Sequence, residues 1–184
     1  MHVEDAQRDV RTVFIGGFAG QLVSGMVWAL SAALGTWRSP RLAVLVLVVG
    51  GMFIFPLTQI LLRVMGRRAS LSKGHPMNGL AMQTAFIVPL CLPLVAAATM
   101  HHLNWFYPAF MIVVGVHYMP FIFLYGMRMF GVLAGILIGA GVLIALYANT
   151  SFSLGGWFTA VVLFAFAFIG RGLAIENRTV AASA

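Results

Sequence analysis

Four side chains that could take part in chemistry lie close together near the end of the apolar stretch 105–126. They are His117, Tyr118, Tyr125 and Arg128. Histidine exchanges a proton near neutral pH, tyrosine donates a hydrogen bond, and arginine binds anionic groups. On a single helix, the residues from His117 to Arg128 turn through about 1100°, only about 20° past three full turns. We therefore expect His117 near mid-membrane, on the same helix face as Arg128 at the cytoplasmic interface.

Polar side chains in the neighbouring apolar stretches fall at a comparable depth. They are Gln21, Thr58, Gln59, Gln83 and Thr84. A polar group in hydrocarbon needs a partner, so these groups are expected to cluster. One interpretation is a binding site for a small molecule, lined by His117, Tyr118, Tyr125, Gln59 and Gln83, with Arg128 at its mouth. The other is structural: such groups hydrogen-bond across helices, each bond contributing roughly 0.6–2 kcal/mol.

The acidic residues lie outside the apolar stretches, which argues against several kinds of chemistry. They are Glu4, Asp5, Asp9 and Glu176. Proton pumps and cation-coupled transporters usually place carboxylates inside the bilayer. Hydrolases need clustered metal ligands or a complete catalytic triad. Cys91 is the only cysteine, and His117 has no second histidine at its depth to complete haem ligation. We therefore predict no catalytic residues, no metal and no cofactor.

Six long apolar stretches must position these side chains. They cover residues 13–35, 42–65, 79–100, 105–126, 129–148 and 153–174. A helix needs roughly 20 mostly apolar residues to cross a bilayer, and each stretch can meet that length. With 61% hydrophobic and 8% charged residues, the chain is also too apolar for a soluble domain. We predict an all-α polytopic membrane protein, a single domain over residues 1–184 built as a bundle of six transmembrane helices.

The basic residues are distributed unevenly between the two sides of this bundle. Nine belong to the tails, the second loop and the fourth loop: Arg8, Arg11, Arg63, Arg67, Arg68, Lys73, Arg128, Arg171 and Arg178. The other two, Arg38 and Arg41, share the first loop. Short loops rich in Lys and Arg stay in the cytoplasm. This predicts a bacterial inner-membrane protein with both termini cytoplasmic. The net charge of +7 then indicates contact with anionic membrane lipids, not with nucleic acid.

Prolines and glycines inside the apolar stretches suggest where helices bend and where they pack. Pro56 and the pair Pro89 and Pro93 predict bent or broken helices. Small residues four apart let two helices approach closely, and this spacing recurs at Gly131, Gly135 and Gly139. We expect this glycine ladder to be a packing face inside the bundle. The alternative is a contact between copies in a homo-oligomer.

The segment GVHYMPF from Gly115 to Phe121, followed by LYGMR up to Arg128, resembles a family signature. The family consists of small bacterial integral membrane proteins, carried as a domain of unknown function. Its pattern is G-x-H-[FY]-[LM]-P, then L-Y and a nearby arginine. The segment IFPL at 54–57 resembles an earlier F-P motif of the same family. The resemblance implies a multi-helix membrane fold, supplies no activity, and points to His117, Pro120, Tyr125 and Arg128.

Three classes of function follow from these observations, in decreasing order of preference. The first is a small binding or transport protein for a neutral, amphipathic or anionic small molecule or lipid. The second is a non-catalytic membrane scaffold that acts through helix packing and the basic loop from Arg67 to Lys73. The third is an intramembrane enzyme. A binding protein requires a polar site inside the bundle, whereas a scaffold requires only packing faces and the loop.

Overall fold

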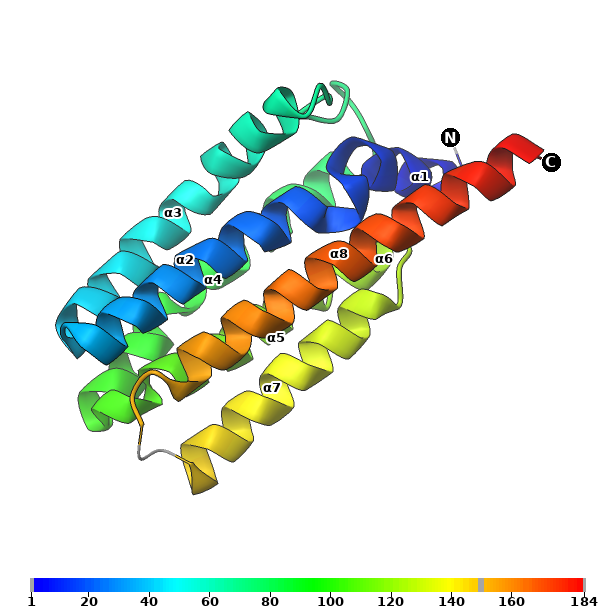
Figure 1. The fold of residues 1–184 in the computed structure, drawn as a ribbon. Coiled ribbons are helices and arrows are strands. Elements are labelled where there is room, and N and C mark those ends of the chain that lie inside the picture. The colour runs from blue at the N-terminus through cyan, green and yellow to red at the C-terminus, as the bar shows by residue number, and fades with distance from the viewer. Residues whose placement is uncertain (1, 149–150, 184) are drawn as a thin grey trace.

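The computed structural model describes residues 2–148 and 151–183, with side chains described as far as Ile175. The described chain is helical and contains no strand (Figure 1). In chain order the helices are α1 (Val3–Phe14), η1 (Ile15–Gly17), α2 (Phe18–Trp37), α3 (Pro40–Val64), α4 (Asn78–His101), η2 (Leu103–Trp105), α5 (Phe106–Tyr118), α6 (Phe121–Tyr125), α7 (Met129–Tyr147) and α8 (Leu154–Ser183).

Six helical segments of the described chain are long and apolar enough to cross a bilayer. Two of them, α3 and α4, turn most of their apolar side chains outward. Phe55 of α3 is 68% exposed and Leu90 of α4 is 75% exposed. Such surfaces are costly in water but compatible with acyl chains. The predicted all-α, multi-pass membrane fold is confirmed.

α2 lies at the centre of the helix arrangement. It packs against α3 on one side and α8 on the other, while α5 packs against α7 and α4. α8 also contacts α7 and α5. In Figure 1, α3, α2, α8 and α7 run side by side, with α4 and α5 behind them. The core therefore lies where α2 and α8 meet α5 and α7.

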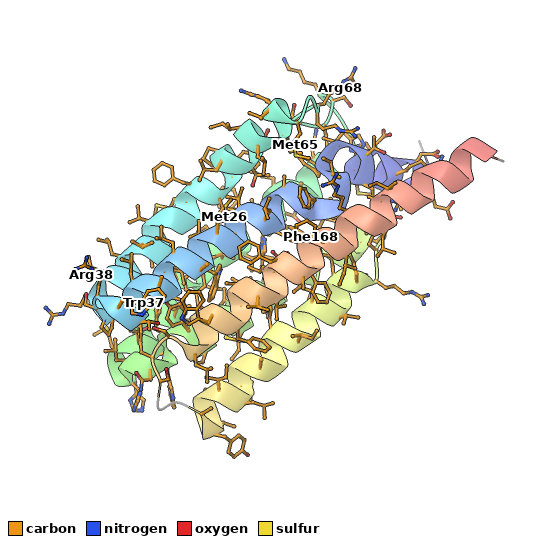
Figure 2. All side chains as sticks on the ribbon, in the orientation of Figure 1. Met26, Trp37, Arg38, Met65, Arg68 and Phe168 are labelled. Carbon is orange, nitrogen blue, oxygen red and sulfur yellow. The ribbon has the colours of Figure 1, made fainter. Side chains whose placement is uncertain are left out.

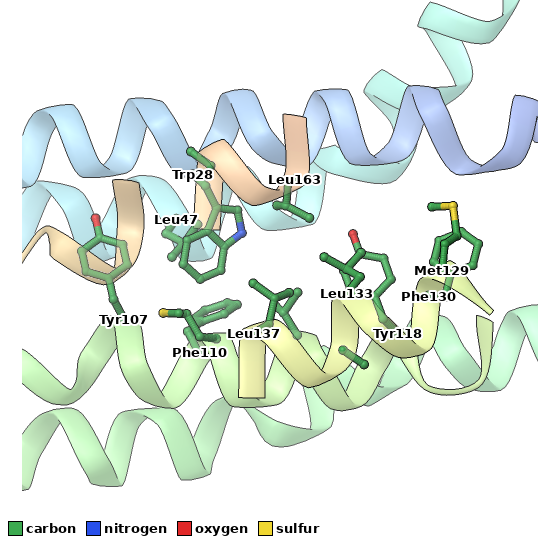
Figure 3. Packing of buried hydrophobic residues seen from close by; sticks show 14 of the residues in the cluster. Trp28, Leu47, Tyr107, Phe110, Tyr118, Met129, Phe130, Leu133, Leu137 and Leu163 are labelled. Atoms are coloured by element: carbon green, nitrogen blue, oxygen red, sulfur yellow. The ribbon is translucent and has the colours of Figure 1, made fainter. Parts of the chain in front are cut away.

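Large apolar side chains fill this core (Figure 3). Trp28 of α2 and Phe110 of α5 meet edge to face, with ring centroids 5.5 Å apart. Leu47 of α3, Leu137 of α7 and Leu163 of α8 are each at most 1% exposed. Because lipid is as apolar as these side chains, close packing, more than removal from water, holds the helices together.

A buried hydrogen-bond network ties three helices together near the end of the bundle where α2 stops and α5 begins. Ser31 of α2 donates to the backbone oxygen of Ala43 in α3 over 2.8 Å. The Tyr107 hydroxyl of α5 lies 2.6 Å from the Ser31 oxygen, and both side chains are 0% exposed. Since the Ser31 proton is committed to Ala43, Tyr107 is the donor in the second bond. This network satisfies polar groups that would otherwise be costly to bury.

The first span begins later than the hydropathy pattern predicts. α2 starts at Phe18 and not at residue 13, because Ile15, Gly16 and Gly17 adopt left-handed backbone conformations with φ of 51°, 62° and 85°. Two glycines make this break inexpensive. A side chain at Gly16 would collide with the backbone of Gly170, so α8 passes directly against the break. Residues 3–14 form the separate helix α1.

The prolines act differently from expectation. α3 and α4 continue through Pro56, Pro89 and Pro93, because transmembrane helices tolerate a freed carbonyl. Of the predicted bends or breaks, a break at these prolines is therefore wrong, and a bend stays a prediction. The break occurs between α5 and α6, at Pro120. There the Met119 N–H donates to Val116 O over 3.1 Å, which tightens the turn.

Candidate functional site

His117 lies in the last turn of α5 and is held by a neighbouring helix. Its Nδ1 is 2.9 Å from the backbone oxygen of Thr84 in α4. A carbonyl oxygen only accepts, so Nδ1 carries the proton in this bond. The ring centroid is 5.6 Å from that of Tyr118 and 5.0 Å from that of Phe121. This bond joins α5 to α4, as the structural interpretation of His117 requires.

Tyr118 and Tyr125 belong to a cluster of aromatic rings formed by α5, α6 and α7. This ring cluster consists of Tyr118, Phe121, Tyr125 and Phe130. The closest pair is Tyr125 and Phe130, with centroids 4.8 Å apart, and Phe121 lies 5.3 Å from both Tyr118 and Phe130. The two tyrosines are buried, at 5% and 6% exposed. The structure therefore brings together three of the predicted site residues: His117, Tyr118 and Tyr125.

The other three predicted site residues lie elsewhere. Gln83 is exposed, Gln59 is half-buried on α3, and Arg128 is exposed at the N-cap of α7. Among the described residues, no hydrogen bond or ring contact joins them to the ring cluster. The expected alignment of His117 with Arg128 on one helix is also wrong. Left-handed Gly126 ends α6, so Arg128 belongs to the turn before α7.

Gln21 of α2 is the most unusual polar side chain in the bundle. It is 2% exposed, and in the described part of the chain neither its amide nitrogen nor its oxygen has a hydrogen-bond partner. Gly17, one turn before it, faces the rings of Phe130 and Tyr125. Trp28, two turns after it, meets Phe110. Residues seven apart share a helix face, so Gln21 lies on the face of α2 that Trp28 turns toward α5.

The Tyr118 hydroxyl belongs to the same region. Figure 3 shows it pointing from α5 toward the side on which α2 runs. The core thus buries two neutral groups, the Gln21 carboxamide on α2 and the Tyr118 phenol on α5. Each can both donate and accept a hydrogen bond. Sequence reasoning placed Gln21 at the right depth, but it could not show that Gln21 is the group without a partner.

α1 closes one end of the bundle. Gln7 Nε2 donates to Phe123 O over 2.7 Å, and Arg11 Nη1 donates to Tyr125 O over 2.6 Å. Both acceptors are carbonyls in the last turn of α6, where backbone donors run out, and Phe123 O also accepts from the Gly126 N–H over 3.3 Å. Sequence reasoning missed this helix. Its signal was the spacing of Ala6 and Val10, which are both buried in the core cluster.

The basic loop between α3 and α4 covers the other side of α1. Met77 belongs to the same buried cluster as Ala6 and Val10. His75 is 7% exposed, accepts from the Met77 N–H at Nδ1 over 3.2 Å, and places Nε2 3.7 Å from Asp9 of α1. This loop is therefore a packed part of the fold.

A small groove opens at the same end of the molecule. It has a volume of about 80 Å³ and is lined by Arg11, Ile15, Met65, Arg67, Arg171, Ala174 and Ile175. In the sequence, its arginines serve as indicators of topology, and Arg67 belongs to the basic loop of the scaffold hypothesis. They come from three distant segments, so no local pattern could group them. Among the described residues, no cluster of His, Cys, Asp or Glu could hold a metal ion.

Comparison with known proteins identifies the family. The sequence model of a family described as a family of unknown function (DUF7010) matches residues 3–171, and the chain belongs to this family. The resemblance drawn from the GVHYMPF segment is thereby confirmed at the level of an uncharacterised family. No curated protein and no solved structure shows significant similarity to the chain.

Proposed function

We propose that this member of the DUF7010 family is a bacterial inner-membrane protein that binds an amphipathic small molecule or lipid inside its bundle. The polar group of the ligand pairs with Gln21, beside Tyr118 and Tyr125. Both termini face the cytoplasm in this proposal. Its support is that α1, the basic loop and the α6–α7 turn share one end of the molecule (Figure 1). Figure 2 places Met65 and Arg68 at that end, and Trp37 and Arg38 at the opposite end.

The buried, unpartnered carboxamide of Gln21 carries this proposal. Leaving one buried polar group unpaired costs about 1–3 kcal/mol, and a carboxamide brings both donors and acceptors. Leucine or methionine would fill the same space without that cost. A ligand group that both donates and accepts, such as a hydroxyl or an amide, would satisfy it. His117 supports the proposal less, because its bond to Thr84 O already explains its place.

Binding fits the geometry better than passage through the membrane. Toward the opposite end, the bundle is filled by Trp28, Tyr107 and Phe106, which are at most 2% exposed. Because these rings fill the bundle on that side of Gln21, the proposed ligand reaches Gln21 from the α1 side. A closed outer half is what a binding protein requires, whereas a transporter must open both halves in turn.

The test is Gln21→Met, which keeps the size of the side chain and removes its hydrogen-bonding groups. Wild type and variant are purified in mild detergent, bound small molecules are extracted with organic solvent, and each is quantified against protein by mass spectrometry. We expect a species that accompanies wild type and falls at least about tenfold in the variant, since lost pairing of a buried polar group costs that much affinity.

Thr99→Ala is the matched control. Thr99 is a half-buried polar residue of another span that bonds only to Val95 O of its own helix. It should retain the species at the wild-type level. The melting temperature is measured as well. Once the ligand has been removed from both proteins, the melting temperature of Gln21→Met should equal or exceed that of wild type. A species bound equally by all three proteins, or a marked loss of stability in stripped Gln21→Met, would show that the carboxamide is structural and favour the scaffold.

A further inference from the structure

The groove at the α1 end is lined by three arginines and four apolar residues. Arg11 comes from α1, Arg67 from the segment after α3, and Arg171 from α8. The remaining lining residues are Ile15, Met65, Ala174 and Ile175. Each of these cations attracts an anion, so an anion bound among them is attracted by all three at once.

Arg11 is held in place while most of its donors stay free. Its Nη1 donates to Tyr125 O over 2.6 Å. A guanidinium has five N–H donors in a fixed fork, so one bond to a carbonyl leaves the others available. The carbonyl carries no net charge, and therefore the cation itself remains uncompensated. Arg11 thus presents a positioned positive charge to the groove.

The other two arginines are positioned by their surroundings. The Arg171 guanidinium lies over the ring of Phe18, 5.2 Å from its centroid. This cation–π contact orients the group without neutralising it. The backbone N–H of Arg67 donates to Leu62 O over 2.9 Å at the end of α3, which turns the chain back over the helix. Both side chains are exposed and accessible to a ligand.

No acidic side chain compensates this charge in the described part of the chain. In that part, Asp9 lies 3.7 Å from His75, and none of the three groove arginines pairs with a carboxylate. Arginine forks match the oxygens of phosphate groups and form two parallel hydrogen bonds to them. Three such forks around one small space are suited to a tetrahedral oxyanion.

The volume of the groove and its position between helix ends narrow the class of ligand further. The volume of about 80 Å³ is far below the roughly 300–1,000 Å³ of pockets that enclose a whole drug-sized ligand. It accommodates a headgroup and leaves the rest of the molecule outside. Next to it, Val64 is 79% exposed and Ile175 51% exposed, which offers apolar surface at the rim. Basic pockets between helices on the cytoplasmic side are suited to anionic headgroups.

We propose that Arg11, Arg67 and Arg171 form a binding site for an anionic phosphate group, either that of a lipid headgroup or free inorganic phosphate. The site is separate from the Gln21 region and takes a charged group, where Gln21 pairs with a neutral one. Its ligand contacts α1, the segment that follows α3, and α8 at once. Occupancy of the site should therefore also stabilise the packing of these three elements.

The experiment titrates short-chain phosphatidylglycerol, and separately inorganic phosphate, into protein in an uncharged detergent. The rise in melting temperature with concentration gives the apparent Kd. The test variant is Arg67→Gln/Arg171→Gln, which leaves the structural bond of Arg11 intact. Its Kd should rise at least about tenfold for each arginine, because charge-assisted hydrogen bonds are lost. Short-chain phosphatidylcholine shows whether net anionic charge is needed.

Arg63→Gln/Arg68→Gln is the matched control, with the same charge change on neighbouring exposed arginines outside the groove. Its Kd should stay within about threefold of wild type, as expected for exposed charges. An equal loss of affinity in both double variants, or no binding by wild type, would overturn the proposed site. If the groove double variant does not fold, the apparent Kd of the single variant Arg67→Gln is compared with that of Arg68→Gln to answer the same question.

The titrations with phosphatidylglycerol and with inorganic phosphate identify the source of the phosphate group. Binding of phosphatidylglycerol that inorganic phosphate does not compete for assigns the site to a lipid headgroup. Competition by inorganic phosphate assigns it to the free anion, and both results support the groove. Gln21→Met should leave this Kd unchanged, so the groove and the proposed intramembrane site succeed or fail independently.

Discussion

Two buried polar residues of α2, Gln21 and Ser31, show opposite environments along one helix. Ser31 bonds to Ala43 O and receives a bond from Tyr107. Gln21 has no partner in the described part of the chain. A satisfied group such as Ser31 holds helices together, whereas an unsatisfied one costs stability unless something else pairs with it. The difference separates a structural residue from a candidate binding residue.

Ser31→Ala should destabilise the protein by about 1–3 kcal/mol, because the Tyr107 hydroxyl, itself 0% exposed, loses its acceptor. Unfolding by sodium dodecyl sulfate in mixed micelles measures the effect. Tyr107→Phe removes the other partner, and the double variant should cost less than the sum of the two single changes. Strict additivity would show that the two hydroxyls do not interact.

At the scale of elements, glycines of α7 serve different purposes on different faces. A Cβ at Gly141 would lie 2.9 Å from Pro108 O of α5, so this glycine is where α7 approaches α5. At Gly135 and Gly139 a Cβ would meet nothing within 4 Å, and both residues are exposed. The expectation that the ladder packs inside the bundle is therefore wrong for these two. Contact between copies through the exposed face stays a prediction.

Gly141→Ala should destabilise the α5–α7 contact by about 1–3 kcal/mol, because the added methyl forces the helices apart. Gly135→Ala should be neutral or stabilise by up to about 1 kcal/mol, since alanine favours the helix and meets no neighbour. The same unfolding assay compares the two. Equal effects at both positions would contradict the packing described for α7.

At the scale of the whole molecule, polar structure is unevenly divided between the two ends. One end carries α1, the packed basic loop, the turn before α7 and the arginine groove (Figure 1). The opposite end carries aromatic rings, among them Trp37 and Trp157, whose centroids are 5.8 Å apart. Aromatic residues favour membrane interfaces and basic residues favour the cytoplasm. This asymmetry supports the proposed orientation.

Cysteine labelling tests that orientation directly. In a Cys91→Ser background, Ser70→Cys places a thiol at an exposed position of the basic loop, and Leu103→Cys places one at the opposite end, where Leu103 is 46% exposed. In intact spheroplasts, a membrane-impermeant maleimide should label Leu103→Cys, and it should reach Ser70→Cys only after permeabilisation. The reverse pattern would place both termini outside.

The sequence by itself determined the number of spans, the helical class and the family. Hydropathy is a local property that adds up over about 20 residues, so six apolar stretches are visible without any knowledge of contacts. The GVHYMPF segment is equally local, and it led to the family that covers residues 3–171. Positions where the backbone turns left-handed, such as Ile15, were beyond this kind of reasoning.

Only the tertiary structure decided which polar groups meet. His117 and Thr84 O, Arg11 and Tyr125 O, and the three arginines of the groove come from segments far apart in the chain. Helical periodicity predicts a residue's face only while the helix continues, and the break at Pro120 ended the expected alignment of His117 with Arg128. Burial of Gln21 without a partner depends on every neighbouring helix at once. Sites of this kind arise from packing, which no local pattern encodes.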